Sequence, residues 1–303
     1  MAQRFGGETL ESYQNYDKME QEWTNVYAGF NVLGRMVHSQ NGETPDADIA
    51  NLVIALWGAL RQFTLYAGRW DEKIQLSTLA YTVTSALSKW DDAGWSAYDV
   101  SWILYLRDQL DEATVWVERS AQAWAHDVPL SDRAYALRMR ALLAQKKKEY
   151  VTAEQTMQRA LEMWETEKGD FDISVGLHEL ADFAYERGEL KIANAYYQRT
   201  LELSVKMNDQ ESLAAVYGSL GNLYLDRQQV AQAREQFEKE LQFADEIGRV
   251  DLVASAKFGL ARIARLEGNT DRALKLATEA KIILQGMQKA LLKDVLTFIT
   301  ELQ

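Results

Sequence analysis

A register of 40 residues runs through this sequence and constrains its fold more than any other feature. Positions spaced 40 apart carry alanine in five of six cases, in the series Lys73, Ala113, Ala153, Ala193, Ala233 and Ala273. No insertion is needed to keep the spacing. Periods of about 20 to 50 residues are typical of arrays in which each unit packs against its neighbours. We therefore predict a repeat array.

A second set of positions keeps the same register and is small in five of six units: Arg61, Ser101, Ala141, Ala181, Gly221 and Ala261. Small side chains at a crossing let two helices approach closely. Between the two sets lie Gly68, Gly188 and Gly268, where glycine can end a helix in the left-handed conformation. With 2 prolines and 17 glycines, the chain lacks the turns of a sandwich or barrel. The predicted fold class is all-α, with a helix, a tight turn and a second helix in each unit.

The helix pairs are expected to fill residues 46–286 as six units of 40 residues, the first with helices near 46–66 and 70–89. A helical segment over 1–45 precedes them. A terminal helix over 287–303 has an apolar face made by Leu291, Val295, Phe298 and Leu302. Because the last unit of an array has no further neighbour, we expect this helix to cap its open end.

One unit resembles the tetratricopeptide repeat family. The residues LGNLY at 220–224, followed by Ala233 and Phe237, are similar to the pattern W-x2-L-G-x2-Y then A-x3-F, with Tyr217 in the tryptophan position. The other five units match less completely, and the period exceeds the family's length of about 34 residues. The resemblance implies a right-handed α-solenoid of six helix pairs with an N-terminal helical segment and a C-terminal capping helix.

The long period also resembles that of signalling scaffolds and of the C-terminal sensor regions of STAND-class signalling NTPases. The segment 20–28 is similar to the helix that often opens such a sensor array. The phosphate-binding pattern G-x4-G-K-[ST] does not occur in the sequence. The resemblance therefore implies a sensor part without the nucleotide switch, in an intracellular signalling NTPase or scaffold.

Residues that carry common chemistries are scarce. The chain has no cysteine and three histidines, His38, His126 and His178, and none of them belongs to an H-E-x-x-H pattern. The nucleophile pattern G-x-S-x-G is also missing. We expect a protein that is not an enzyme and that uses no metal and no cofactor.

Net charge and hydropathy limit the classes of partner that we expect for this chain. The formal net charge of −12 repels phosphate backbones and anionic membrane surfaces. No run approaches the roughly 20 apolar residues that span a bilayer, and residues 49–60 are interpreted as part of a buried helix. No export signal is visible at the N-terminus. We expect neither nucleic acid nor membrane as a partner, and a cytoplasmic location.

The tetratricopeptide resemblance implies that the second, fifth, ninth and twelfth positions of the first helices face a concave groove. In the second unit these positions form an aromatic stripe: Trp95, Tyr98, Trp102 and Tyr105. Further along, the candidate binding residues are mixed, polar and basic: Tyr135, Arg138, His178, Asp182, Asn222 and Arg262. Two interpretations of the stripe stay open, rings exposed to the groove and core rings packed between units.

The function we expect is a non-catalytic interaction or sensor module whose concave face binds a protein or peptide segment. Asn222 with Arg262 is only a partial likeness to the clamp with which some family members hold a peptide's terminal carboxylate. The alternative is a small-molecule sensor in which the aromatic stripe stacks on a sugar or similar ligand. A compact pocket would favour this alternative over a continuous open groove.

Overall fold

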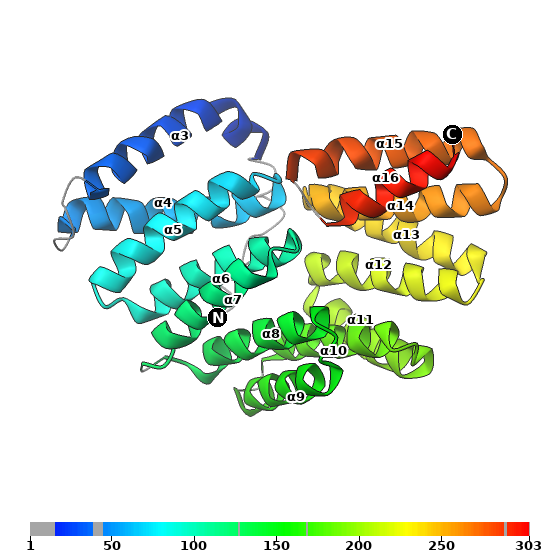
Figure 1. Ribbon diagram of the computed structural model, residues 1–303, viewed down its shortest axis with the longest axis horizontal. Helices are drawn as coiled ribbons and strands as arrows, with labels where there is room; N and C mark the ends of the chain where they lie inside the picture. The colour runs from blue at the N-terminus through cyan, green and yellow to red at the C-terminus, as the bar shows by residue number, and fades with distance from the viewer. Residues whose placement is uncertain (1–15, 39–44, 127, 168, 288–289, 303) are drawn as a thin grey trace. The chain divides into compact units, whose positions relative to one another are not determined.

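The computed structural model describes residues 16–38, 45–126, 128–167, 169–287 and 290–302. These ranges contain 14 helices and no strand (Figure 1). Residues 1–15 and 39–44 of the predicted leading segment, and 288–289 and 303 of the predicted cap, lie outside them. Contacts divide the chain into two compact units, residues 1–104 with 111–128 and residues 105–110 with 129–303.

The helices follow the predicted pairs closely. The first unit holds α3 (Tyr16–His38), α4 (Ala47–Tyr66), α5 (Trp70–Ala86) and most of α6 (Trp90–Leu106) and α7 (Leu110–Ala123). The second unit holds α8 (Leu130–Lys146), α9 (Tyr150–Glu167), α10 (Asp170–Glu186), α11 (Leu190–Met207), α12 (Gln210–Asp226), α13 (Val230–Glu246), α14 (Val250–Leu266), α15 (Thr270–Met287) and α16 (Leu291–Leu302). Each pair from α4/α5 to α14/α15 is one repeat, and α16 follows the last.

The turns inside the pairs repeat the 40-residue register in the backbone. Gly68, Gly188 and Gly268 have φ of 70°, 78° and 76°, as predicted for left-handed helix ends. The equivalent residues of the other pairs are also left-handed although they carry side chains, namely Asp108, Lys148 and Gln228. The packing of the array therefore imposes this turn even where glycine is absent.

Both sets of small residues lie at helix crossings. All six positions of the first set are buried, with exposed fractions of 1% for Lys73 and 0% for the five alanines. In the fifth pair, Phe237 packs between α12 and α14. A Cβ added to Gly221 or Gly259 would lie 2.6 or 2.5 Å from the Phe237 ring. These positions are small because the neighbouring side chain occupies the space.

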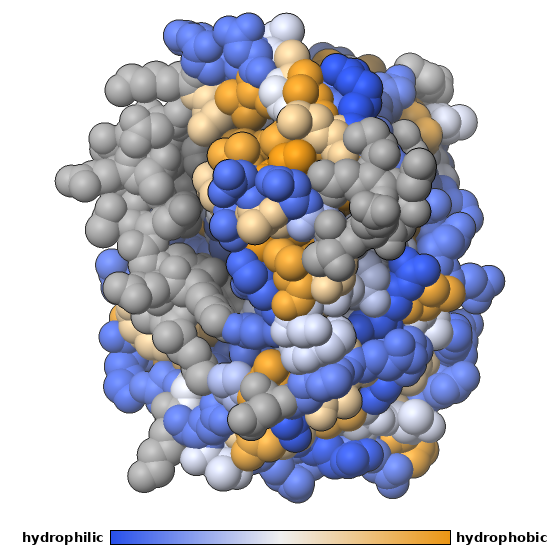
Figure 2. All heavy atoms as spheres, turned by 90° about the vertical axis from the view of Figure 1, so that its left-hand side faces the viewer, coloured by the Kyte–Doolittle hydropathy of each residue, from blue (hydrophilic) through white to orange (hydrophobic). Residues whose placement is uncertain are grey.

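Helix α3 packs on the first pair. Trp23 is buried, its ring centroid is 5.3 Å from that of Phe63, and the Arg69 guanidinium lies over it at 4.5 Å. Among the described helices, α4 alone is long and apolar enough to cross a membrane, and its Trp57 and Leu60 are buried in the first unit. Exposed apolar side chains of α3 and α4 include Val32, Met36 and Leu52. Figure 2, in which the left-hand side of Figure 1 faces the viewer, shows apolar surface among hydrophilic residues.

The cap helix α16 packs on α15 through the predicted apolar face. Val295 and Phe298 are buried. The Phe298 ring meets Phe258 of α14 edge-on, with 5.4 Å between ring centroids. The first turn of α16 lies close to α14 and α12, where the cavity described below opens.

Candidate functional site

The start of the aromatic stripe on α6 belongs to the core of the first unit. Trp95 and Tyr98 are 2% and 6% exposed. Trp95 meets Trp124 edge-on with 4.9 Å between ring centroids, and Gly94 provides the space, since a Cβ there would lie 2.1 Å from the Trp124 indole nitrogen. The expectation that Trp95 and Tyr98 face a groove is corrected, because the ring of Trp124, directly after α7, packs against both rings.

The other two rings of the stripe are less covered. Trp102 and Tyr105 are half-buried. The Lys146 ammonium lies 5.6 Å from the centroid of the Tyr105 ring. Burial raises the pKa of Tyr105, and the nearby Glu179 and Asp182 raise it further. A role in ligand binding stays a prediction for these two residues.

On α8, Tyr135 and Arg138 are buried against α10 and are not free to meet a partner. Tyr135, 4% exposed, donates its hydroxyl to Asp172 at 2.6 Å. Arg138, 9% exposed, donates through Nε to Glu179 Oε1 at 3.0 Å. Their predicted exposure is corrected. In the second unit successive first helices contact one another, so a long polar side chain at this register reaches the helix about 40 residues further on.

Polar groups meet on α10 and α12 around His178. Its Nε2 lies 2.9 Å from Ser219 Oγ and 3.9 Å from Asp182 Oδ1. Asp182 also accepts a hydrogen bond from the Tyr197 hydroxyl at 2.5 Å. Desolvation raises the pKa of the Asp182 carboxyl, although His178 lowers it. The side chains of His178 and Asp182 remain 20% and 38% exposed.

The cluster does not have the geometry of a nucleophilic triad. In such a triad the carboxylate orients the histidine through the ring nitrogen that does not contact the serine. Here Asp182 approaches the same nitrogen, Nε2, that contacts Ser219. Within the described ranges there is also no group of three or more side chains suited to hold a metal ion.

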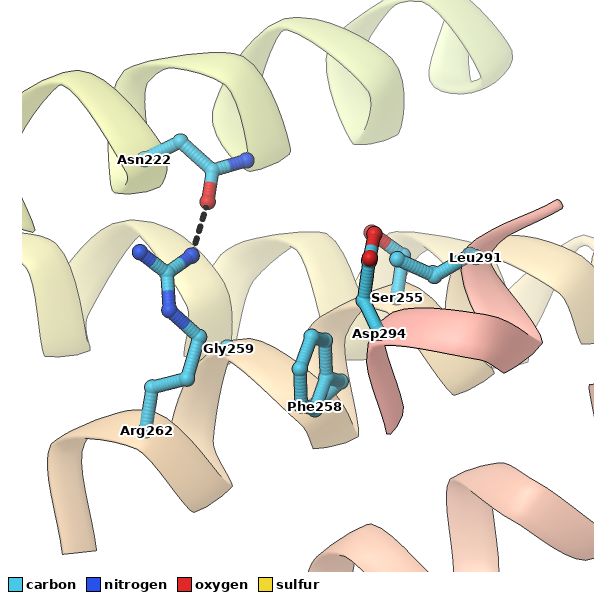
Figure 3. Close-up of a pocket in the computed structure, with 7 residues that line it drawn as sticks. All are labelled: Asn222, Ser255, Phe258, Gly259, Arg262, Leu291 and Asp294. Atoms are coloured by element: carbon cyan, nitrogen blue, oxygen red, sulfur yellow. Dashed lines mark hydrogen bonds between the residues drawn. The ribbon is translucent and has the colours of Figure 1, made fainter. Parts of the chain in front are cut away.

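Asn222 and Arg262, the partial clamp predicted from the sequence, are brought together. Arg262 Nη1 donates to Asn222 Oδ1 at 2.7 Å, and Nη2 lies 3.9 Å from Asp226. Both residues line a cavity of about 310 Å³ between α12, α14 and α16. Its remaining walls come from Ser255, Phe258, Gly259, Leu291 and Asp294 (Figure 3).

A second, larger hollow shares Arg262, Phe258 and Asp294 with this cavity. It has a volume of about 580 Å³ and extends along α14 and α16 past Arg265, Leu266, Thr297, Phe298 and Glu301. Arg265 forms an ion pair with Glu301 at 2.6 Å, and this pair joins α14 to the cap helix. The second unit therefore offers a compact cavity that is continuous with a more open groove.

Several residues of this region were missed by the sequence analysis: Ser219, Asp226, Ser255 and Asp294. Asp226 follows Asn222 by one helical turn, and this spacing could have placed it on the same face. No comparable spacing in the sequence indicated that Asp294 belongs to this region. The cap helix was considered only for its apolar face, and the register does not show which side of α16 lies beside α14.

These features define the class of protein: an all-α array of tetratricopeptide-like helix pairs, as predicted. No protein-family model and no curated protein matches the chain. Solved structures match it in fold. A Rap protein complexed with Competence and Sporulation Factor has a TM-score of 0.59 and 10% identity, over 97% of this chain and 100% of that one. The apo form of RapI has a TM-score of 0.58 and 16% identity, over 91% and 99%.

A third similar structure is a STAND protein with a tetratricopeptide repeat sensor from Pyrococcus horikoshii. Its TM-score is 0.53 at 13% identity, over 98% of this chain and 50% of that one. This chain therefore matches about half of the larger protein. At such identities the similarity shows the fold alone.

Proposed function

We propose that the chain is a non-catalytic interaction or sensor module that binds a protein or peptide segment. The proposed surface is the face of α10, α12 and α14 that carries His178, Asp182, Asn222 and Arg262. The observation that carries the proposal is that these side chains keep part of their surface accessible, with 38% for Asp182 and 33% for Arg262. The face leads into the groove of about 580 Å³ beside the cap helix.

The structural comparisons support this proposal through known examples of the fold. One similar structure holds a Rap protein complexed with Competence and Sporulation Factor, and another is described as a tetratricopeptide repeat sensor of a STAND protein. By analogy we propose that this chain is part of an intracellular signalling NTPase or scaffold in the cytoplasm. Fold analogy does not identify the partner.

The sugar-sensing alternative loses its basis in the first unit. Stacking on a sugar requires accessible ring faces, and Trp95 and Tyr98 are almost fully buried. We therefore do not retain Trp95 and Tyr98 as ligand-stacking residues, and a role in ligand binding stays a prediction only for Trp102 and Tyr105.

Selection of peptides from a displayed library on the immobilised 303-residue chain tests the proposal. Asp182→Ala and Arg262→Ala should each weaken the selected peptides, because both remove charged groups from the proposed face. Arg199→Ala on α11 and Glu235→Ala on α13 are matched controls, since both side chains are exposed on second helices. Equal affinity of all four variants, with unchanged thermal melting, would place the binding surface elsewhere.

A further inference from the structure

The cavity of about 310 Å³ beside the cap helix has opposite charges on opposite walls. Figure 3 shows the Arg262 guanidinium on one side, beside Asn222, and Asp294 on the other side, beside Ser255. Phe258 lies between them. All of these residues belong to the second unit. The volume lies at the small end of the range of about 300–1,000 Å³ that is typical of ligand pockets, which suits a ligand of one residue rather than an extended segment.

The wall with Arg262 suits a carboxylate. A guanidinium has five N–H donors, and the bond from Nη1 to Asn222 Oδ1 at 2.7 Å uses one of them. The closest Asp226 oxygen is 3.9 Å from Nη2, which is beyond hydrogen-bond distance. Asn222 also contributes an amide group to this wall. A carboxylate in the cavity would therefore find donors on Arg262, and Asn222 would hold the guanidinium in place.

The opposite wall suits an ammonium group. Asp294 stands in the first turn of α16 and lines the cavity together with the Ser255 hydroxyl. A carboxylate is an acceptor only and binds ammonium donors strongly. In so small a space Asp294 also repels a ligand that carries negative charge alone. The two walls together favour a ligand that carries both charges.

We propose that this cavity binds a free α-amino acid with an apolar side chain. The carboxylate of the ligand meets Arg262, its ammonium meets Asp294 and Ser255, and its side chain packs on Phe258 and Leu291. This site shares Arg262 and Asn222 with the peptide-binding face proposed above, but it takes a zwitterionic ligand in the small cavity, so leucine binding tests it separately from peptide binding. A small-molecule site would let the array respond to a metabolite as well as to a protein.

Isothermal titration calorimetry on the 303-residue chain tests the proposal with three probes. Leucine carries both charges, N-acetyl-leucine keeps only the carboxylate, and leucinamide keeps only the ammonium. Leucine should bind at least about tenfold more tightly than either analogue, because each analogue loses one charge-assisted contact. Equal affinity for leucine and N-acetyl-leucine would overturn the proposal, since it would indicate a site for a lone anion. Absence of binding by all three probes at millimolar concentration would also overturn it.

Two variants test which charged group of the ligand each wall of the cavity binds. Asp294→Asn should remove the preference for leucine over N-acetyl-leucine, and Arg262→Gln should remove the preference for leucine over leucinamide. Asp271→Asn, in the first turn of α15, and Arg199→Gln, on α11, are matched controls that should leave all three affinities unchanged. Melting curves verify that each variant is folded. If both controls lowered leucine affinity as much as the cavity variants, the proposal would be wrong.

Discussion

The first and fifth helix pairs place different chemistry at the same register positions. Three equivalent positions within the first and fifth pairs carry Arg61 and Gly221, Lys73 and Ala233, and Ser77 and Phe237, and a further position on the first helix of the following pair carries Asp99 in α6 and Gly259 in α14. Around the fifth pair three of these four residues are small. The fourth, Phe237, is 1% exposed and fills the space that the two glycines leave.

Where the first pair meets α6, a buried ion cluster occupies the equivalent space. Arg61 donates to both Asp99 oxygens, from Nε at 2.7 Å and from Nη2 at 2.9 Å. Lys73 Nζ lies 3.3 Å from Asp99 and donates to the Arg61 carbonyl at 2.9 Å. The Trp57 indole donates to Asp99 at 3.2 Å. One carboxylate therefore serves two cations.

The comparison shows that the repeat register specifies where helices cross but not which forces hold the crossing. An apolar crossing is stabilised by burial and close packing, and its strength does not depend on protonation. An ion cluster depends on the carboxylate that its cations share, because removing this carboxylate leaves the cations buried without that partner. Four predictions follow from this contrast, in order of decreasing effect.

The largest effect is expected for Phe237→Ala in the fifth pair. Loss of the buried ring should lower the free energy of unfolding by about 3–5 kcal/mol, because Gly221 and Gly259 have no side chains to fill the cavity. Urea unfolding followed by circular dichroism measures this change. The equivalent change in the first pair, Ser77→Ala, should be nearly neutral, since the buried hydroxyl has no hydrogen-bond partner within the described part of the chain. Similar losses from both variants would contradict the contrast.

The next effect concerns the carboxylate of the ion cluster. Asp99→Ala should destabilise the first unit by about 3 kcal/mol, since it leaves Arg61 buried without its partner. The destabilisation is limited at Lys73, because this side chain can release its proton and become neutral when Asp99 is removed. Lys73→Met keeps the Arg61–Asp99 pair and should be neutral or slightly stabilising. Hydrogen exchange in α4 and α5 reports both changes locally. A loss from Lys73→Met as large as that from Asp99→Ala would show that Lys73 is essential to the cluster.

Stability of the first pair should also depend on pH. Burial lowers the pKa of Lys73 to about 8 from an ordinary value of 10.5, although Asp99 raises it. Between these two pH values the unfolded chain binds more protons at Lys73 than the folded chain, so stability rises as the pH increases. The expected gain is on the order of 2–3 kcal/mol.

Other groups titrate in the same range, so the measurement compares the wild type with Lys73→Met. The difference in their unfolding free energies should shift in favour of the wild type between pH 8 and 10.5. A constant difference across this range would mean that Lys73 has an ordinary pKa in the folded protein.

The smallest effect tests the turns of the same two pairs. The first pair turns at Gly68, whereas the fifth turns at Gln228, with φ of 70° and 60°. A left-handed conformation costs a residue with a side chain about 1–2 kcal/mol, and glycine loses more backbone entropy on folding. Gln228→Gly should therefore stabilise the fifth pair by about 0.5–1 kcal/mol, and Gly68→Gln should destabilise the first by a similar amount. A higher melting temperature for Gln228→Gly and a lower one for Gly68→Gln would confirm this prediction.

The repeat architecture was determined by the sequence alone. The alanine set from Ala113 to Ala273 and the glycines at 68, 188 and 268 predicted the helix crossings and the turns correctly. They could do so because a crossing or a turn depends on a few residues at fixed spacing, and the period of 40 made each position visible several times. The same register predicted that Asn222 and Arg262 lie on the same face of the array, since they occupy equivalent positions on neighbouring first helices.

Only the tertiary structure decided which side chains on those helices are accessible. The rings of Trp95 and Tyr98 are buried because Trp124, directly after α7, packs on them. The guanidinium of Arg138 is buried because Glu179 approaches it from α10. The ion cluster of the first pair and the cavity between Arg262 and Asp294 arose in the same way, from residues about 30 to 40 positions apart. Periodicity places a residue on a face of its helix. Whether that face is covered depends on the volume and charge of side chains that the neighbouring helices bring to it, and no single helix encodes these.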